Sequence, residues 1–292
     1  MTVTSAEKRD KAFEKELKYI RKLERELQRD AMKGDLPWKK ALESKIPPKI
    51  HSNLRAAFIA AFGVIFDSGV TVIEKTFNKE ELMQEYAVRN VSVDISTTRK
   101  ELAELRNEAA RSDAFKSIVT TLEGVGLGAF GIGLPDIVFF IGYMLKSIYE
   151  TALKYGYDYD KPEERYLILK LMAASIKKRE DWVEADIEVN ELIENLVIPE
   201  EEEMTKQIEA TADAFAIDML LMKFIQGIPI VGIVGGLSNP YYFMKIMEYV
   251  RIKYHKRYLL EKKWEAGSWS IRAYLRIWRN SIRTLNQQRR KS

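Results

Sequence analysis

The chain has 292 residues, of which 46% are hydrophobic and 31% charged, and its formal net charge at pH 7 is +4. This length can bury a substantial core, and a mean hydropathy of −0.27 argues against an integral membrane protein. The sequence contains no cysteine, which excludes disulfides and thiolate metal sites. Its first residues lack the apolar stretch of a secretory signal, so we expect a cytoplasmic protein.

Apolar residues recur at spacings of three and four through most of the first half, which predicts helices. Gly34 ends the first of these, and Pro47 with Pro48 precede the second. Asn78, three residues before Glu81, has the spacing of a helix capping box. The helices predicted here cover residues 5–33, 53–66, 78–88 and 98–111, and a short one starts at residue 113.

The second half continues the helical pattern. Pro135 and Asp136 suit the first turn of a helix that runs to about residue 154, and Asp160 is a plausible cap for a helix starting at Pro162. Pro199 precedes another helix, whose four consecutive glutamates we interpret as a solvated first turn. Further helices are predicted for residues 180–196, 201–225, 240–250 and 269–285. We therefore predict an all-α, multi-helix bundle.

Two segments, 124–145 and 226–250, share one design: glycine-rich apolar residues, a proline, then an aromatic helix. Asp136 interrupts the first and two prolines the second, so a straight membrane span is disfavoured, although a membrane-dipping hairpin and an internal duplication both stay open. The first segment also fits GxGxxG, but no βαβ pattern surrounds it. Two buried Gly-rich helical turns are the favoured interpretation.

The same two turns are a candidate pocket for an apolar ligand or lipid. Glycines let the backbone come close to a ligand, and an Asp and an Asn would supply the polar groups. The residues of this candidate pocket are Gly126, Gly128, Gly131, Asp136, Gly232, Gly235 and Asn239.

No catalytic constellation is readable. The only histidines are His51 and His255, and nucleophile or zinc motifs are absent. The acidic residues between 158 and 164 lack the spacing and glycine of an EF-hand, so we interpret them as a loop and cap. We predict no metal and no cofactor, and favour a non-enzymatic protein.

Charge is distributed unevenly along the chain. Residues 251–292 contain 13 Lys or Arg and 2 Glu, a net +11, which leaves −7 for residues 1–250. In the predicted helix 269–285, six apolar residues share one face and four arginines flank it. This pattern is typical of an interfacial membrane helix, with an anionic membrane surface or a membrane protein as partner. The candidate contact residues are Trp269, Arg272, Tyr274, Arg276, Trp278, Arg279 and Arg283.

Two other interpretations of this helix stay open. It could pack its apolar face on the core as the last helix of the domain. Arginines interleaved with aromatics also bind nucleic acids, but no recognition motif supports that partner. The sequence does not indicate an oligomeric state.

Four stretches, taken in order, resemble the EcsC family of bacterial proteins: "WKK" followed by "KIPPKI", "GLGAFGIGLPD", "YGYDYDKPEERYLILKLM" and "IPIVGIVGGLSNPYYFMKIMEYVRIKYHKRYL". The resemblance covers roughly residues 38–260 and implies an all-helical fold and, as partner, an ABC transporter. The resemblance implies no catalytic residues. We divide the chain into an N-terminal helix (1–34), an EcsC-like helical domain (35–266) and a basic amphipathic C-terminal helix (267–292).

Overall fold

The computed structural model describes residues 5–33, 46–66, 73–95, 97–109, 134–225 and 240–265, and these residues form helices and no strand. The all-α prediction is confirmed for this part of the chain. The helices are α1 (Ser5–Met32), α3 (Pro48–Val64), α5 (Lys79–Ile95), α6 (Arg99–Ala109), α8 (Leu134–Lys154), α9 (Pro162–Ile176), α10 (Arg179–Glu194), α11 (Glu201–Ile225) and α12 (Pro240–Glu265).

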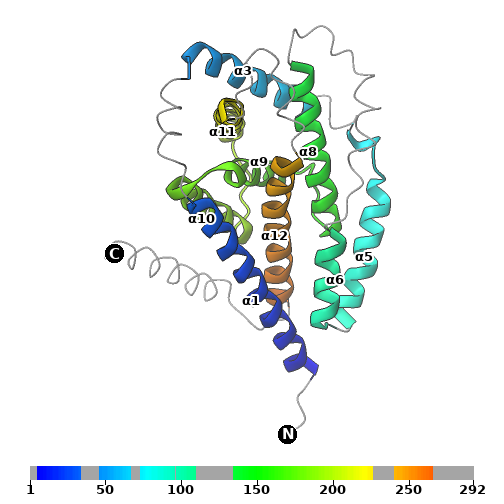
Figure 1. Ribbon diagram of the computed structural model, residues 1–292. Coiled ribbons are helices and arrows are strands. Elements are labelled where there is room, and N and C mark those ends of the chain that lie inside the picture. The colour runs from blue at the N-terminus through cyan, green and yellow to red at the C-terminus, as the bar shows by residue number, and fades with distance from the viewer. Residues whose placement is uncertain are drawn as a thin grey trace, which may run out of the picture.

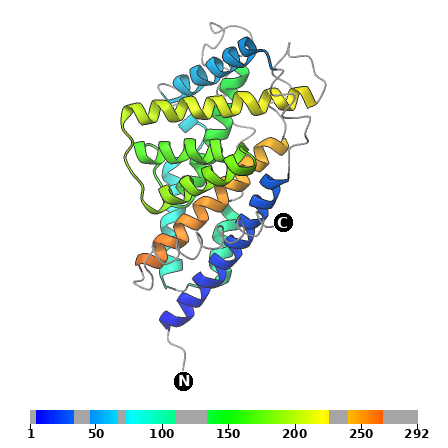
Figure 2. The same ribbon diagram turned by 90° about the vertical axis from the view of Figure 1, so that its left-hand side faces the viewer.

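The helices stack in successive layers (Figures 1 and 2). α11 lies between α3 and α9, and α9 in turn packs against α10 and α12. α1 runs along α12 and also touches α6 and α10. α5 packs against α8 and α6, and lies at the right-hand edge of Figure 1. α12 is therefore surrounded by helices from the start and the middle of the chain.

Two helix starts follow the capping chemistry of their sequences. The Glu81 amide donates to Asn78 Oδ1 at 3.1 Å, as the predicted capping box requires. Before α6, the Thr98 amide donates to Glu101 while the Glu101 amide donates to Thr98 Oγ1. The three glutamates that begin α11 are exposed, as predicted for a solvated first turn.

The predicted cap at Asp160 is wrong. Lys161 is the N-cap residue of α9 and makes no capping hydrogen bond with its side chain. Asp160 instead accepts a 2.5 Å hydrogen bond from Lys79 Nζ, which also bonds Asp158 at 3.2 Å. An ion pair with a lysine at the start of α5 outcompetes the local bond to the helix amides.

The turn between α8 and α9 is closed by a Schellman motif. The Gly156 amide donates to the Leu153 carbonyl and the Tyr157 amide to the Ala152 carbonyl, while Gly156 has φ +83°. Tyr159 stacks on Tyr149 of α8 with ring centroids 4.1 Å apart. The predicted loop is confirmed, and it contributes Tyr155, Tyr157 and Tyr159 to the core.

Candidate functional site

α12 is buried on nearly all sides although it is rich in charged residues. Every residue from Ile252 to Leu260 is buried, including Lys253, His255 and Lys256. Burying a charge is costly unless the charge is paired. The polar side chains of α12 must therefore find partners on other helices, and they do so in three clusters.

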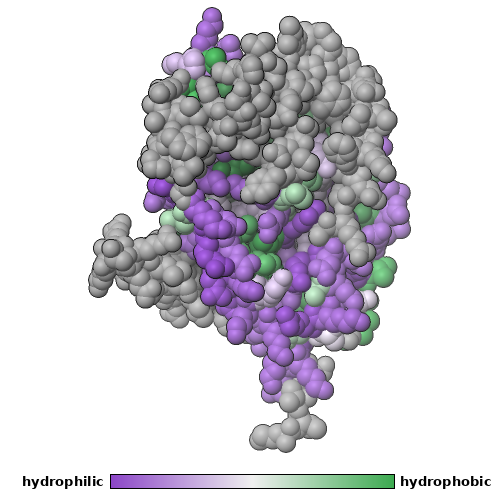
Figure 3. Space-filling view, in the orientation of Figure 1, coloured by the Kyte–Doolittle hydropathy of each residue, from purple (hydrophilic) through white to green (hydrophobic). Residues whose placement is uncertain are grey.

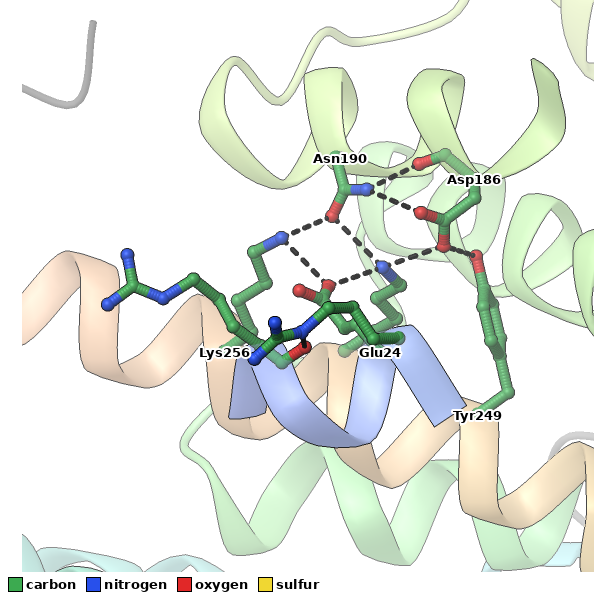
Figure 4. Close-up of polar contacts among 8 residues, drawn as sticks. Glu24, Asp186, Asn190, Tyr249 and Lys256 are labelled. Atoms are coloured by element: carbon green, nitrogen blue, oxygen red, sulfur yellow. Dashed lines mark hydrogen bonds and ion pairs between the residues drawn. The ribbon is translucent and has the colours of Figure 1, made fainter. Parts of the chain in front are cut away.

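The first cluster, here called the Glu24 cluster, joins α1, α10 and α12 (Figure 4). Lys253 Nζ and Lys256 Nζ both donate to Glu24 Oε1, at 2.7 and 2.8 Å. Both also donate to Asn190 Oδ1, at 3.1 and 2.8 Å. One carboxylate oxygen and one amide oxygen therefore hold two buried ammonium groups.

Asp186 of α10 completes the Glu24 cluster. Its Oδ1 lies 2.7 Å from Lys253 Nζ and accepts a 2.9 Å hydrogen bond from the Tyr249 hydroxyl. Its Oδ2 accepts one from Asn190 Nδ2 at 3.0 Å. The two carboxylates and two ammonium groups balance in charge, which is what a buried polar cluster needs.

Electrostatics in the Glu24 cluster keep the Glu24 carboxyl ionised. Burial raises the pKa of Glu24, but the ammonium groups of Lys253 and Lys256 outweigh burial and lower that pKa to about 2. The pKa of the Tyr249 hydroxyl is raised by burial and by the Asp186 carboxylate. Tyr249 is therefore a neutral donor to Asp186.

The second cluster places His255 between a phenol and a carboxylate. His255 Nδ1 lies 3.1 Å from the Tyr155 hydroxyl, and Nε2 lies 3.3 Å from Glu16 Oε1, which also pairs with Arg106. Burial lowers the pKa of His255, and Glu16 offsets this only in part. Tyr155, His255 and Glu16 are all buried, so this phenol–imidazole–carboxylate chain lies inside the protein and presents no atom to a substrate.

The third cluster is centred on Glu164 of α9. Its carboxylate accepts hydrogen bonds of 2.6 Å from both the Tyr254 hydroxyl and Arg257. The Arg257 guanidinium also lies 3.6 Å from the centroid of the Tyr157 ring. Glu164 lies in the first turn of α9 and is a buried ion-pair partner, a role that the interpretation of residues 158–164 as a loop and cap did not include.

The end of α12 is tied down by two further lysines. Lys262 Nζ donates to Asp94 of α5 at 2.9 Å, and Lys263 pairs with Glu14 of α1. Including the three clusters, α12 is bonded through its cations to α1, α5, α9 and α10. This arrangement clamps α12 in place. Within the described ranges, no group of three or more His, Asp or Glu side chains is placed to hold a metal ion.

These ion pairs correct one interpretation of the sequence. The basic residues after position 250 were taken together as a surface for an anionic partner, yet five of them point inward to carboxylates: Lys253, Lys256, Arg257, Lys262 and Lys263. These five cations are therefore not available to an anionic partner. Partners such as Glu16 and Glu24 were not singled out, although they share one face of α1 with Phe13, Leu17 and Ile20.

The residues singled out for binding lie almost entirely outside the described ranges. Asp136 lies in the first turn of α8, but its side chain is outside the description. The other pocket candidates, at 126, 128, 131, 232, 235 and 239, and all seven contact residues between 269 and 283 fall in ranges that are not described. The ligand pocket and the buried Gly-rich turns stay predictions.

Comparison with known proteins gives one clear match. The model of the family described as "EcsC protein family" matches residues 12–259, a range that begins within α1 and ends within α12. No curated protein and no solved structure matches. None of the helices in the described ranges has the length and apolarity needed to cross a membrane.

Proposed function

The chain belongs to the EcsC protein family, and we propose that this member is a non-enzymatic cytoplasmic protein that associates peripherally with an anionic membrane surface through residues 266–292. The observation that carries the proposal is the distribution of paired and uncompensated charge. Cations of α12 are paired with carboxylates of other helices. Residues 266–292, in contrast, contain seven Lys or Arg and no Asp or Glu.

The pattern of this segment suits a membrane surface. Ile271, Leu275, Trp278 and Ile282 recur at helical spacing, and arginines flank them. Each Arg near an anionic leaflet contributes about 1 kcal/mol, so four contribute about 4 kcal/mol before any apolar insertion. Such binding is reversible and sensitive to salt, as expected of a peripheral protein.

The ion pairs that fix the last turn of α12 also support the proposal. The segment follows Glu265, and the last turn of α12 is held by Lys262 and Lys263 on α5 and α1. Trp264, in the same turn, is 64% exposed. An exposed tryptophan just before a basic segment is suited to a membrane interface.

Flotation with phosphatidylserine-containing and with purely zwitterionic vesicles, at low and high salt, tests the proposal. The full chain is compared with a version that ends at Gly267. We expect salt-sensitive flotation with anionic vesicles only, and its loss on truncation while the helical circular dichroism signal persists. Equal flotation of both versions would contradict the proposal.

The alternative partner is a protein embedded in the membrane, such as the ABC transporter that the family resemblance suggests. It would give binding to native membranes without binding to protein-free anionic vesicles. That result would show that the partner is a membrane protein and not the lipid surface.

A further inference from the structure

α5 has a second apolar face that points away from the bundle. Val88, Val91 and Ile95 are 69%, 55% and 79% exposed and, with exposed Gln84, recur at spacings of four, three and four. Figure 3 shows hydrophobic surface at the right-hand edge, where Figure 1 places α5. These four residues are here called the α5 outer face. A helix with apolar residues on two faces is suited to pack on both.

α12 runs beside α5 on the side that carries Asn90 and Asp94, about 110° around the helix from the α5 outer face. Tyr258 donates to Asn90 at 3.2 Å and Lys262 donates to Asp94 at 2.9 Å, so each step along α12 matches the same step along α5. The two helices therefore run in parallel at this point. Because Lys262 is bonded to Asp94, the chain leaves α12 at Glu265 beside the end of α5 that carries Ile95.

The next residues can bring the chain around that end of α5. Residues 266–270, "AGSWS", are few and include a glycine, as is typical of the connection in a helical hairpin. The six steps from Glu265 to Ile271 span about 20 Å when extended. An α-helix with its side chains is about 10 Å across, so a helix starting near Ile271 can reach the α5 outer face.

A helix that turns back at this point runs antiparallel to α5, and its apolar residues then match the α5 outer face in spacing. Ile271, Leu275, Trp278 and Ile282 are separated by four, three and four residues, as are Ile95, Val91, Val88 and Gln84 in the reverse direction. In this register Ile271, Leu275 and Trp278 face apolar residues of α5, and Ile282 faces the polar Gln84.

Charge favours the same pairing. α5 contains four acidic and two basic residues. Glu85 pairs with Arg89 and Asp94 with Lys262, so Glu80 and Glu81 in its first turn are the carboxylates that favour a basic partner. The segment 266–292 contains only basic charges. An acidic helix with an apolar outer face complements a basic helix with an apolar stripe.

We propose that residues 271–282 dock in cis on the α5 outer face, antiparallel to α5, with Leu275 against Val91 and Trp278 against Val88. Docking requires no membrane and does not depend on the proposed function.

Engineered disulfides test the register, because the natural chain has no cysteine. The in-register variant carries Val91→Cys and Leu275→Cys. The matched control carries Val91→Cys and Ile282→Cys, whose second cysteine lies on the same helix face but about 10 Å further along. A disulfide needs Cα atoms within about 7 Å. The full-length variants are oxidised without lipid, and the intramolecular disulfide is quantified by mass spectrometry after alkylation of free thiols.

We expect the in-register pair of cysteines to form an intramolecular disulfide at least tenfold faster than the control pair, in a monomeric protein. Equal rates would mean that the segment does not dwell in this register and would overturn the proposal, as would faster closure of the control pair. Disulfide-linked dimers in place of closed monomers would show that a second copy occupies the face. Lipid is absent, so failure here is distinguishable from failure of membrane binding.

Discussion

Glu24 Oε1 lies within 2.8 Å of two buried lysine nitrogens, so both ammonium groups share this carboxylate oxygen. The Oε2 atom of the same carboxylate has no hydrogen-bond partner among the described residues. Replacing the carboxylate by an amide leaves two cations close together in the core. Asp186 would then be the one carboxylate left in the Glu24 cluster to balance two ammonium groups.

We expect Glu24→Gln to lower the free energy of unfolding by about 3–5 kcal/mol, the usual cost of removing one partner from a buried ion pair. Urea denaturation followed by circular dichroism measures this loss. Glu26→Gln is the matched control, because Glu26 is partly exposed and pairs with Lys22 and Arg29 at the surface. Surface pairs contribute less than about 1 kcal/mol, so comparable losses in the two variants would contradict the buried cluster.

The pKa of Glu24 also predicts a pH dependence. Since the pKa falls from 4.5 to about 2 on folding, the folded chain binds fewer protons here than the unfolded chain between these pH values. The stabilisation is complete above pH 4.5 and is lost as pH falls towards 2. The stability gap between wild type and Glu24→Gln should therefore narrow over this range, and a constant gap would argue against it.

His255 predicts a second pH dependence at higher pH. Glu16 of α1, Arg106 of α6 and Tyr155 lie around it, and burial keeps its pKa below 6.5 in the folded state. As pH falls, His255 is therefore protonated at a higher pH in the unfolded chain than in the folded chain. The free energy of unfolding decreases as pH falls below 6.5.

Unfolding free energies between pH 7.5 and 5.5 test this. The decrease in the free energy of unfolding between pH 7.5 and pH 5.5 should be smaller in His255→Gln than in wild type. The control is His51→Gln, since His51 lies near the surface beside Asp213. An unchanged slope in His255→Gln would contradict the assignment.

Among the helices, some starts could be predicted, but several lengths could not: the helix predicted for residues 78–88 runs to Ile95, and the one predicted for 240–250 runs to Glu265. Local chemistry sets a helix start, so the Asn78 cap could be inferred from the sequence. The true partner of Asp160 is Lys79, 81 residues away, and no local pattern reveals that distance. The inward lysines of α12 were missed for the same reason, since their carboxylates lie on α1 and α10.

The turn between α8 and α9 provides a test at the scale of an element. Gly156 has φ +83°, and an added Cβ would lie 2.3 Å from Cζ of Tyr86. We expect Gly156→Ala to destabilise the fold by about 2 kcal/mol, from backbone strain and displacement of the Tyr86 ring. Gly63→Ala in α3 is the control, because no atom lies within 4 Å of its added Cβ. There we expect no loss, or a gain of up to about 1 kcal/mol. Thermal unfolding compares the two, and equal effects would contradict the motif.

At the scale of the whole molecule, the net charge of +4 combines two different populations of cations. Those of α12 are paired in the interior and hold the helices together. Those beyond Glu265 are available, in our proposal, for an external surface or for the outer face of α5. Sequence alone gives the sum of these charges, and only the fold separates them.

The most direct test of the account is vesicle binding by a variant with four arginines of the C-terminal segment replaced, Arg272, Arg276, Arg279 and Arg283 each by Gln. The matched control removes four exposed cations of the body: Lys22, Arg29, Lys100 and Lys206, each by Gln. Both variants lose the same charge. At about 1 kcal/mol per Arg, partitioning into anionic vesicles should fall roughly a thousandfold in the first variant and change little in the control. Equal losses would show that net charge alone drives binding, and would contradict a dedicated C-terminal contact.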